Sequence, residues 1–275
     1  GPIKSIASII TSHSIDQVLV CLPNDDDKNI EYVVSVCENL NILVSILSSP
    51  TNQFGMGSKR VTNYANIPIL FFKNYPLDDL ENKIFKRAFD IIFSLFIILF
   101  IFTWLFPIVA ILIKLSSRGP VFYIQYRWGI NNKKIKCFKF RTMFIGDNEI
   151  SSDGHYMPAT QNDQRISTIG HFLRKTSIDE MPQFFNVILG GMSVVGPRPH
   201  PIPLNLESKD HINNYLLRHL IKPGITGWAQ VNGSRGEVKE MIDMQNRVNF
   251  DIWYIENWTY WLDLQIIFQT IINLI

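Results

Sequence analysis

The feature that most constrains the fold is an uncharged apolar run, IIFSLFIILFIFTWLFPIVAILI, at residues 91–113. At about 1.5 Å per helical residue, this run is long enough to cross the hydrocarbon core of a bilayer, and the alternative is a buried core helix. Pro107 lies inside the run, where it removes a helix hydrogen bond and favours a kink. The run therefore predicts a membrane helix that bends near Pro107.

Basic residues flank this run on both sides: Lys83, Lys86 and Arg87 before it, and Lys114 and Arg118 after it. Cationic flanks prefer the cytoplasmic face of a membrane, and a single crossing satisfies that preference at one end only. A helix that enters, bends and returns satisfies it at both ends, with Ser94 and Thr103 able to hydrogen-bond backbone groups freed by the bend. We therefore predict a re-entrant membrane helix over about residues 84–115.

The charges are distributed unevenly, although the net charge is only +2. Between Asp90 and Asp147 there is no acidic residue, whereas the same stretch holds many basic ones: Lys114, Arg118, Arg127, Lys133, Lys134, Lys136, Lys139 and Arg141. Such a block predicts an anionic partner, which could be lipid head groups, phosphates or nucleic acid. The cysteines form no CxxC pair, which fits a reducing compartment, and the histidines show no zinc-binding spacing.

Residues 1–80 have the pattern of an α/β unit. The runs QVLVCLP (17–23), ILVSIL (42–47) and IPILFF (67–72) are strand-like, and the segment DKNIEYVVSVCENL between the first two has apolar residues at helical spacing. The sequence FGMG (54–57) does not match GxGxxG, so dinucleotide binding is not expected. We interpret this region as a partial Rossmann-like domain with a packing or regulatory role.

Residues 81–275 have a mixed α+β pattern. PVFYIQYRWG and KIKCFKFRTM predict two strands around the turn INNKK, and helices are expected at 166–175, 179–189, 205–220 and 237–257. The C-terminal region is rich in aromatic residues: Trp253, Tyr254, Trp258, Tyr260 and Trp261. These fit either an ordinary core or an interfacial belt on amphipathic helices, and beside an apolar insertion we favour the belt.

An adjacent acid pair, Asp179 and Glu180, stands at an expected helix start. One interpretation is structural: Ser177 and Glu180 form a capping box, or Asp179 is the N-cap with Pro182 in the first turn. The other interpretation is chemical, because cations surround the pair in sequence: Lys139, Arg141, Arg165, Arg174, Lys175 and Arg198. Two carboxylates among many cations suggest Mg²⁺ and phosphate, with one acid free to attack phosphorus.

These motifs together resemble a known family. The segment from about residue 83 to the end is similar to the bacterial sugar transferases, the monotopic polyprenyl-phosphate hexose-1-phosphate transferases. The matching stretches are KRAFDIIFS, GPVFYIQYRWG, KFRTM, DQRISTIGHFLRKTSIDEMPQFFNVILGGMSVVGPRPH, KPGITGWAQVNGSRGE and DIWYIENWTYWLDLQII. The resemblance implies that residues 81–275 form a monotopic phosphoglycosyl transferase domain.

The resemblance also implies a reaction and its residues. A UDP-sugar and undecaprenyl phosphate would give the lipid diphosphate sugar and UMP, by a ping-pong route that needs Mg²⁺. Asp179 would form a covalent phosphosugar adduct, and Glu180 would join it in binding the metal. The residues implied to contact substrate phosphates or lie near them are Lys139, Arg141, Asp163, Arg165, Arg174, Arg198 and Asp251. The sequence has DQR where the family commonly has DPR, and Gly191 stands where the family commonly has an acid.

The expected location is the bacterial inner membrane, with the catalytic domain on its cytoplasmic face in contact with membrane lipid. The stretches TGWAQVNGSRGE and IENWTYWLDL most resemble the family members that start exopolysaccharide or capsule synthesis with glucose-1-phosphate, so the resemblance implies that sugar, and galactose or an N-acetylhexosamine stays open. Nucleic acid is not expected as a partner, and a homodimer is left open. Two rival functions are a nucleotide-sugar hydrolase that uses water and a non-catalytic membrane-tethered scaffold for polysaccharide assembly.

Overall fold

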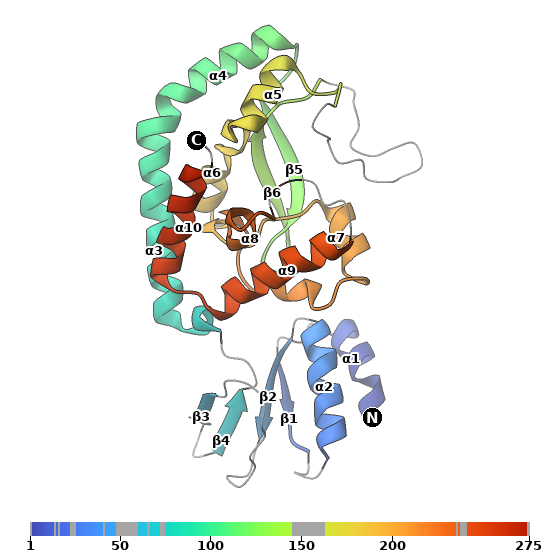
Figure 1. Cartoon of the computed structure of the whole chain (residues 1–275). Coiled ribbons are helices and arrows are strands. Elements are labelled where there is room, and N and C mark those ends of the chain that lie inside the picture. The colour runs from blue at the N-terminus through green and yellow to red at the C-terminus, as the bar shows by residue number, and fades with distance from the viewer. Residues whose placement is uncertain are drawn as a thin grey trace.

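The structure of the chain is a computed structural model (Figure 1). It describes residues 2–13, 15, 17–22, 26–40, 42–47, 60–64, 67–71, 75–144, 163–234, 236 and 241–273. Helices and strands mix throughout, and one long apolar helix runs along one side. This mixture, with its single long apolar helix, is consistent with the monotopic architecture expected from the sequence.

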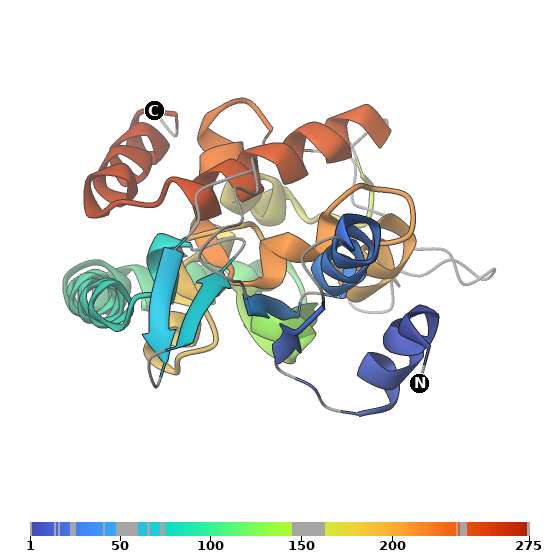
Figure 2. The ribbon, with the colours of Figure 1, turned by 90° about the horizontal axis from the view of Figure 1, so that it is seen from below.

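The N-terminal part forms a small sheet with helices beside it. Its elements are α1 (Ile6–Ser12), β1 (Gln17–Val20), α2 (Asp27–Asn39), β2 (Leu43–Leu47), β3 (Arg60–Tyr64) and β4 (Ile67–Phe71). The strand order is β1-β2-β4-β3, and Figure 2 shows the β3–β4 pair at one side and α1 and α2 at the other. A small core joins the two layers: Ile10, Val20, Ile30, Val33 and Cys37 are all buried.

The strands expected at the starts of 17–23, 42–47 and 67–72 are confirmed, whereas β3 was not predicted. The Rossmann-like character is not confirmed. Within this N-terminal sheet only the described strands β1 and β2 pair in parallel, across α2, while β3 and β4 form an antiparallel hairpin that joins β2 through β4. The FGMG segment lies outside the described residues.

The apolar run forms one continuous helix from Leu80 to Ser116, long and apolar enough to cross a membrane. It consists of α3 (Leu80–Ile97), a π-helical segment η3 (Ile98–Phe102) and α4 (Thr103–Ser116). Figure 1 shows α3 and α4 pointing in different directions, so the helix bends, as predicted. The π segment lies just before Pro107, whose ring crowds the carbonyl one turn earlier, and both features are established causes of helix kinks.

Side chains bond to the carbonyl groups around this bend. Thr103 Oγ1 donates to the Ile98 carbonyl at 2.9 Å, and Trp104 Nε1 donates to the Phe100 carbonyl at 2.7 Å. The expected role of Thr103 is therefore confirmed. The expected role of Ser94 is wrong, because its buried Oγ has no hydrogen-bond partner among the described residues.

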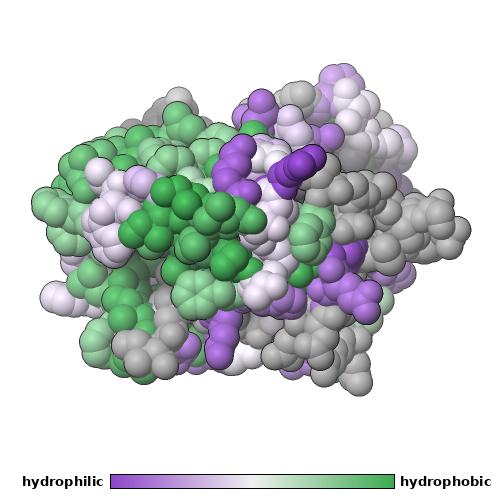
Figure 3. Space-filling view, turned by 90° about the horizontal axis from the view of Figure 1, so that it is seen from above, coloured by the Kyte–Doolittle hydropathy of each residue, from purple (hydrophilic) through white to green (hydrophobic). Residues whose placement is uncertain are grey.

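The outer face of the long helix is apolar and exposed. The exposed side chains are Ile92, Leu95, Phe96, Leu99, Phe100, Trp104, Ile108, Ile111 and Leu115. Exposed apolar residues also occur on α10 (Tyr260–Ile272): Trp261, Phe268, Ile271 and Ile272. Figure 3 shows apolar side chains gathered over part of the face seen from above. A contiguous apolar surface of this kind fits contact with lipid rather than water.

The inner face of α3 is polar and holds the helix against the rest of the protein. Lys86, Asp90 and Ser94 follow one another at four-residue spacing, and all are buried. Lys86 Nζ lies 2.7 Å from Asp263 Oδ2 on α10. Asp90 Oδ1 accepts hydrogen bonds from Ser193 Oγ at 3.0 Å and from the Val194 amide at 2.9 Å. Because each buried charge has a polar partner, the helix is anchored along a defined line.

The remaining elements surround this line. They are β5 (Phe122–Trp128), β6 (Lys134–Phe140), α5 (Thr168–Lys175), η5 (Ile178–Glu180), α6 (Gln183–Ile188), β7 (Ser193–Val195), α7 (Ile202–Ser208), η6 (Tyr215–His219), β8 (Gly224–Thr226), α8 (Trp228–Val231) and α9 (Met241–Glu256). The predicted hairpin is confirmed as β5 and β6, and β7 and β8 form a short parallel pair. The main core contains Val187, Met192, Val195, Tyr254 and Ile266.

Two expectations for this region need correction. The helix predicted over 205–220 is not continuous: α7 ends at Ser208, and η6 begins after Asn214, whose φ of 58° is left-handed. The aromatic residues near the C-terminus do not act as one belt. Tyr254 and Trp258 are buried in the core, where the Tyr254 hydroxyl donates a hydrogen bond to Asp263. The side chains of Trp253, Tyr260 and Trp261 are exposed.

Candidate active site

The acid pair lies on η5, a single 3₁₀ turn between α5 and α6. Ser177 precedes it with a left-handed φ of 56°, and its side chain makes no capping hydrogen bond. The following helix, α6, has no side-chain cap either. Both capping interpretations of the pair are therefore wrong. Successive residues on a 3₁₀ helix are about 120° apart, so the two carboxylates point in different directions.

Glu180 is fully engaged with cations. Its Oε1 lies 2.8 Å from Lys139 Nζ and 2.6 Å from one terminal nitrogen of Arg198, and its Oε2 accepts from the other at 2.9 Å. These two cations, Arg198 first, hold the pKa of Glu180 well below its usual range despite burial. Glu180 therefore stays ionised and keeps both cations in place.

Asp179 has the opposite environment. It is 7% exposed, and within the described part of the chain no group donates a hydrogen bond to its carboxylate. Burial, and then the adjacent charge of Glu180, raise its pKa to about 6, against the opposing effect of Lys139, Arg174 and Arg198. An unpartnered carboxylate with a raised pKa can act as a nucleophile or take a metal ion, because nothing in its surroundings occupies its lone pairs.

Asp179 and Glu180 both line a cavity of about 1030 Å³. One wall is apolar and comes from the long helix and α10: Phe93, Ile97, Ile101, Leu105, Ile267 and Ile271. Cationic side chains line other parts of the same cavity: Arg127, Lys139, Arg174, Arg198 and Arg247. The acid pair thus opens into a space that has an apolar side next to the lipid-like face and a strongly basic side.

A buried ion pair supports the Arg198 segment from behind. Arg218 lies 2.6 Å from Asp251, and both are almost fully buried. Arg218 also donates to the backbone carbonyl of Arg198 at 2.9 Å. Asp251 is not among the residues that line the cavity. It holds Arg218 in place, and Arg218 in turn binds the backbone of Arg198. The two prolines around Arg198 further restrict this segment.

The other predicted site residues differ in whether they reach the cavity. Arg174 lines the cavity and donates from Nε to Thr142 Oγ1 at 2.9 Å. The guanidinium of Arg141 instead donates to the carbonyls of Ser117 and Arg118 at 2.9 and 2.7 Å, just beyond the end of α4. Because those bonds hold it there, Arg141 does not reach the cavity lining.

Asp163 and Arg165 pair with each other at 2.6 Å and also lie outside the cavity lining. The hydrogen bonds from Arg165 lower the pKa of Asp163 to about 2. Their predicted roles toward substrate phosphates stay predictions.

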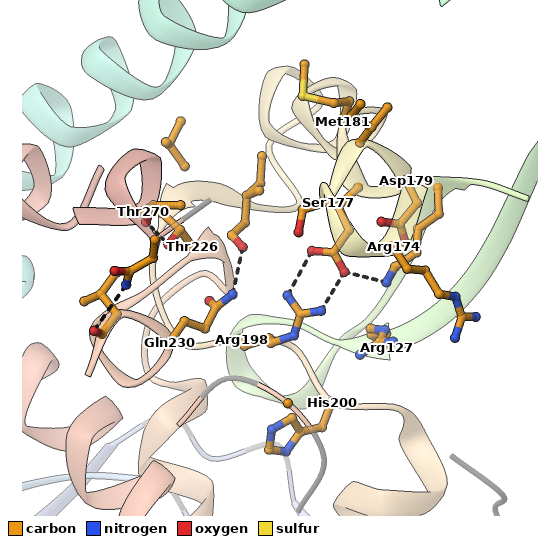
Figure 4. Close-up of a pocket in the computed structure, with 18 of the residues that line it drawn as sticks. Arg127, Arg174, Ser177, Asp179, Met181, Arg198, His200, Thr226, Gln230 and Thr270 are labelled. Atoms are coloured by element: carbon orange, nitrogen blue, oxygen red, sulfur yellow. Dashed lines mark hydrogen bonds and ion pairs between the residues drawn. The ribbon is translucent and has the colours of Figure 1, made fainter. Parts of the chain in front are cut away.

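The structure adds cavity residues that sequence reasoning missed: Arg127, His200, Thr226, Gln230 and Arg247 (Figure 4 labels all but the last). Arg127 was part of the acid-free block, but nothing in its spacing separated it from neighbouring surface cations. Arg247 lies four residues before Asp251 on α9, so helical spacing could have placed both near the same site.

The fit of Mg²⁺ differs between the two acids. Mg²⁺ prefers oxygen ligands, and it often takes one or two carboxylates and completes its shell with phosphate oxygens and water. Asp179 fits this role, because its carboxylate is unpartnered and lines the cavity. Glu180 does not fit in this arrangement, since both of its oxygens already accept charged hydrogen bonds. The described residues contain no cluster of three or more His, Cys, Asp or Glu that could hold a metal ion by itself.

Comparison with known proteins adds independent findings. The family model described as bacterial sugar transferase matches residues 81–275. The chain is 39% identical over 271 residues to the UDP-glucose:undecaprenyl-phosphate glucose-1-phosphate transferase of Escherichia coli strain K12, covering 98% of this chain and 57% of that protein. It is 34% identical over 276 residues to the protein of the same name from Xanthomonas campestris pv. campestris, covering 100% and 56%.

A third relative is named for a different sugar. The UDP-N-acetylgalactosamine-undecaprenyl-phosphate N-acetylgalactosaminephosphotransferase of Aeromonas hydrophila is 39% identical over 187 residues, covering 68% of this chain and 42% of that protein. The chain thus spans little more than half the length of the first two relatives.

Proposed function

The chain belongs to the bacterial sugar transferase family, and from this we propose that it transfers a sugar-1-phosphate from a UDP-sugar to undecaprenyl phosphate and releases UMP. The observation that carries the proposal is the position of Asp179. Its unpartnered carboxylate opens into a cavity with an apolar wall on one side and cations on the other. A lipid phosphate and a nucleotide diphosphate need that combination of surfaces.

The proposed route has two displacements at one phosphorus atom. An Asp179 oxygen attacks the sugar-bearing phosphorus of the UDP-sugar, and the bond from that phosphorus to the bridging oxygen breaks, so that UMP leaves with the electron pair. A phosphate oxygen of undecaprenyl phosphate then attacks the same phosphorus and releases the Asp179 carboxylate. Holding the reacting groups in one cavity supplies much of the rate enhancement. The covalent adduct is part of the proposal.

Glu180 and its cations have different roles in this route: Glu180 positions the cations, and the cations bind phosphate oxygens. Glu180 binds Lys139 and Arg198, so neither cation neutralises Asp179 directly. The guanidinium of Arg198 has five N–H donors, more than Glu180 uses, and its side chain is 31% exposed. It can therefore contact phosphate oxygens while it stays fixed. Mg²⁺, which we propose is bound by Asp179 and substrate oxygens, would neutralise phosphate charge during attack.

A panel of nucleotide sugars incubated with undecaprenyl phosphate tests the function, with UMP release and lipid-linked product measured separately. The proposal expects both products with UDP-glucose, which we propose as the donor because two relatives are named for glucose. Preference for UDP-galactose or a UDP-N-acetylhexosamine would support the proposed reaction but show that the protein transfers a different sugar. UMP release without lipid product would indicate a hydrolase, and no turnover with any donor would indicate a scaffold.

We also propose that the long helix is re-entrant and that the catalytic part lies on the cytoplasmic face of the inner membrane. The bend near Pro107 and the basic residues at both ends support this arrangement. Single cysteines introduced at Lys83 and Lys114 should therefore react with a membrane-impermeant reagent from the same side of sealed inverted vesicles. Reaction from opposite sides would show a full crossing and contradict the proposal.

The raised pKa of Asp179 predicts a pH profile. Below about pH 6 the carboxyl is protonated and cannot attack, so the rate of the first displacement should fall about tenfold per pH unit there and level off above it. UMP release in a single turnover without lipid is the appropriate measurement, because the lipid phosphate itself titrates near pH 6. A rate that stays constant down to about pH 4 would show that Asp179 is not protonated near pH 6 in the complex with substrate and Mg²⁺, and would contradict this prediction.

A further inference from the structure

Arg247 on α9 is a buried cation that has no carboxylate partner among the residues the structure describes. It is 8% exposed and lines the cavity. One terminal nitrogen donates to the Gly236 carbonyl at 3.0 Å, and the other lies 3.5 Å from His200 Nε2. Its Nε has no hydrogen-bond partner among the described residues. The nearby acid, Asp251, forms its ion pair with Arg218 instead.

The described surroundings of Arg247 do not fully neutralise its charge. Burial, and then the charges of Arg218 and Arg198, lower the pKa of Arg247 to about 10 against the opposing effect of Asp251, so the guanidinium remains protonated at neutral pH. Burial and the adjacent Arg218 and Arg247 hold the pKa of His200 well below its usual range, so that ring is neutral. An uncompensated buried charge costs stability. A guanidinium kept in this state beside a cavity is suited to an anion that arrives from outside.

The position of Arg247 separates it from the side where a lipid would enter. The cavity is also lined by residues of α7 and of the first half of α9, the helix that carries Arg247: Leu204, Ser208, Met241 and Met244. Figure 1 shows α7 and the start of α9 on the opposite side of this part of the protein from α3. The apolar wall from α3 is the entry side for a lipid tail, so the Arg247 side is left for the water-soluble substrate.

We propose that Arg247 binds the phosphate of the nucleotide leaving group, which is the phosphate attached to uridine in the UDP-sugar and in UMP. This inference rests on the proposed function, because it assumes a nucleotide diphosphate donor. When Asp179 attacks, the bond to the bridging oxygen breaks and negative charge develops on the departing phosphate. A fixed cation at that phosphate stabilises the charge as it forms. Arg198 and Lys139 remain with Glu180, next to the phosphorus under attack.

The test compares Arg247→Met with Arg218→Met in the full chain, held in detergent or in lipid nanodiscs. Binding of UMP and of uridine is measured by calorimetry, and the melting temperature is measured without ligand. Arg247→Met should weaken UMP binding about 10- to 100-fold and leave uridine binding unchanged, because only UMP carries the phosphate. Arg247→Lys should keep part of the UMP affinity, since it keeps the charge but loses the planar pair of donors.

The melting temperature separates a ligand-binding role from a structural one. Arg247→Met removes an uncompensated charge and should not lower the melting temperature, whereas Arg218→Met leaves Asp251 buried alone and should lower it. Unchanged UMP affinity, or a melting temperature that falls as far as in Arg218→Met, would overturn the proposal. So would a raised KM for undecaprenyl phosphate with unchanged UMP affinity, because the site would then serve the lipid phosphate. Failure of the wild type to transfer sugar-phosphate would count against the proposed function alone, since UMP binding is measured without turnover.

Discussion

The Asp179→Asn protein should fold normally and lose sugar-phosphate transfer by roughly three orders of magnitude or more. Folding should be preserved because no described residue donates a hydrogen bond to this carboxylate, and because a neutral amide is easier to bury than an acid. Transfer should be lost because an amide cannot attack phosphorus. Melting temperature and UMP release, measured on the same preparation, separate the two effects.

A labelled sugar-phosphate shows directly whether Asp179 forms a covalent adduct. With a sugar-labelled donor and no lipid acceptor, the wild type should retain label on the protein when Mg²⁺ is present, and Asp179→Asn should retain none. Glu180→Gln is the comparison: it should also be severely impaired, because Lys139 and Arg198 lose their common partner. Near-normal transfer by Asp179→Asn would refute the covalent route.

Arg198→Ala should cost about 1.5–3 kcal/mol in transition-state stabilisation, which corresponds to a loss of roughly one to two orders of magnitude in kcat/KM. The substitution removes a phosphate contact and also leaves Glu180 with Lys139 alone. Arg198→Lys should recover part of the loss, because it restores the charge without the two parallel bonds to Glu180.

Lys133→Ala is the matched control for Arg198→Ala. Lys133 is exposed in the turn between β5 and β6, where its backbone carbonyl accepts from the Gly129 amide and its side chain is not part of the cavity lining. Its removal takes away one positive charge and should leave kcat/KM within about twofold, as is usual for an exposed charge. Equal, small effects of the two substitutions would argue against Arg198 as a phosphate ligand.

The sequence predicted the centre of the site better than its periphery. Asp179, Glu180, Lys139 and Arg198 were expected together, and the structure brings them within ion-pair distance or into one cavity. These residues carry specific local patterns, since an adjacent acid pair and an arginine between prolines are unusual. Arg141 was expected beside them because it follows Lys139 closely. However, β6 ends at Phe140, so the strand alternation that would place Arg141 on the same face as Lys139 no longer applies. Arg141 instead bonds to carbonyls beyond α4.

The remaining parts depended on contacts that a linear pattern does not carry. Arg247 and Asp251 lie on the same helix, yet Asp251 forms its ion pair with Arg218 and not with Arg247. Arg218 belongs to η6, which packs against α9. The aromatic residues near the C-terminus also differ in burial because of helix packing: Trp258 points into the core, while Trp261 is exposed on α10. Composition alone favoured a single belt, whereas the direction of each side chain is fixed by how α9 and α10 pack.

The bond between Lys86 and Asp263 sets an order of events during biosynthesis. Lys86 leaves the ribosome 177 residues before its partner, and Asp90 is made 104 residues before the Val194 amide that it binds. Unpartnered lysine and aspartate side chains are costly in hydrocarbon. The polar line of α3 therefore gains its partners only once β7 and α10 have been synthesised, so this helix cannot complete its packing against the rest of the protein as it emerges.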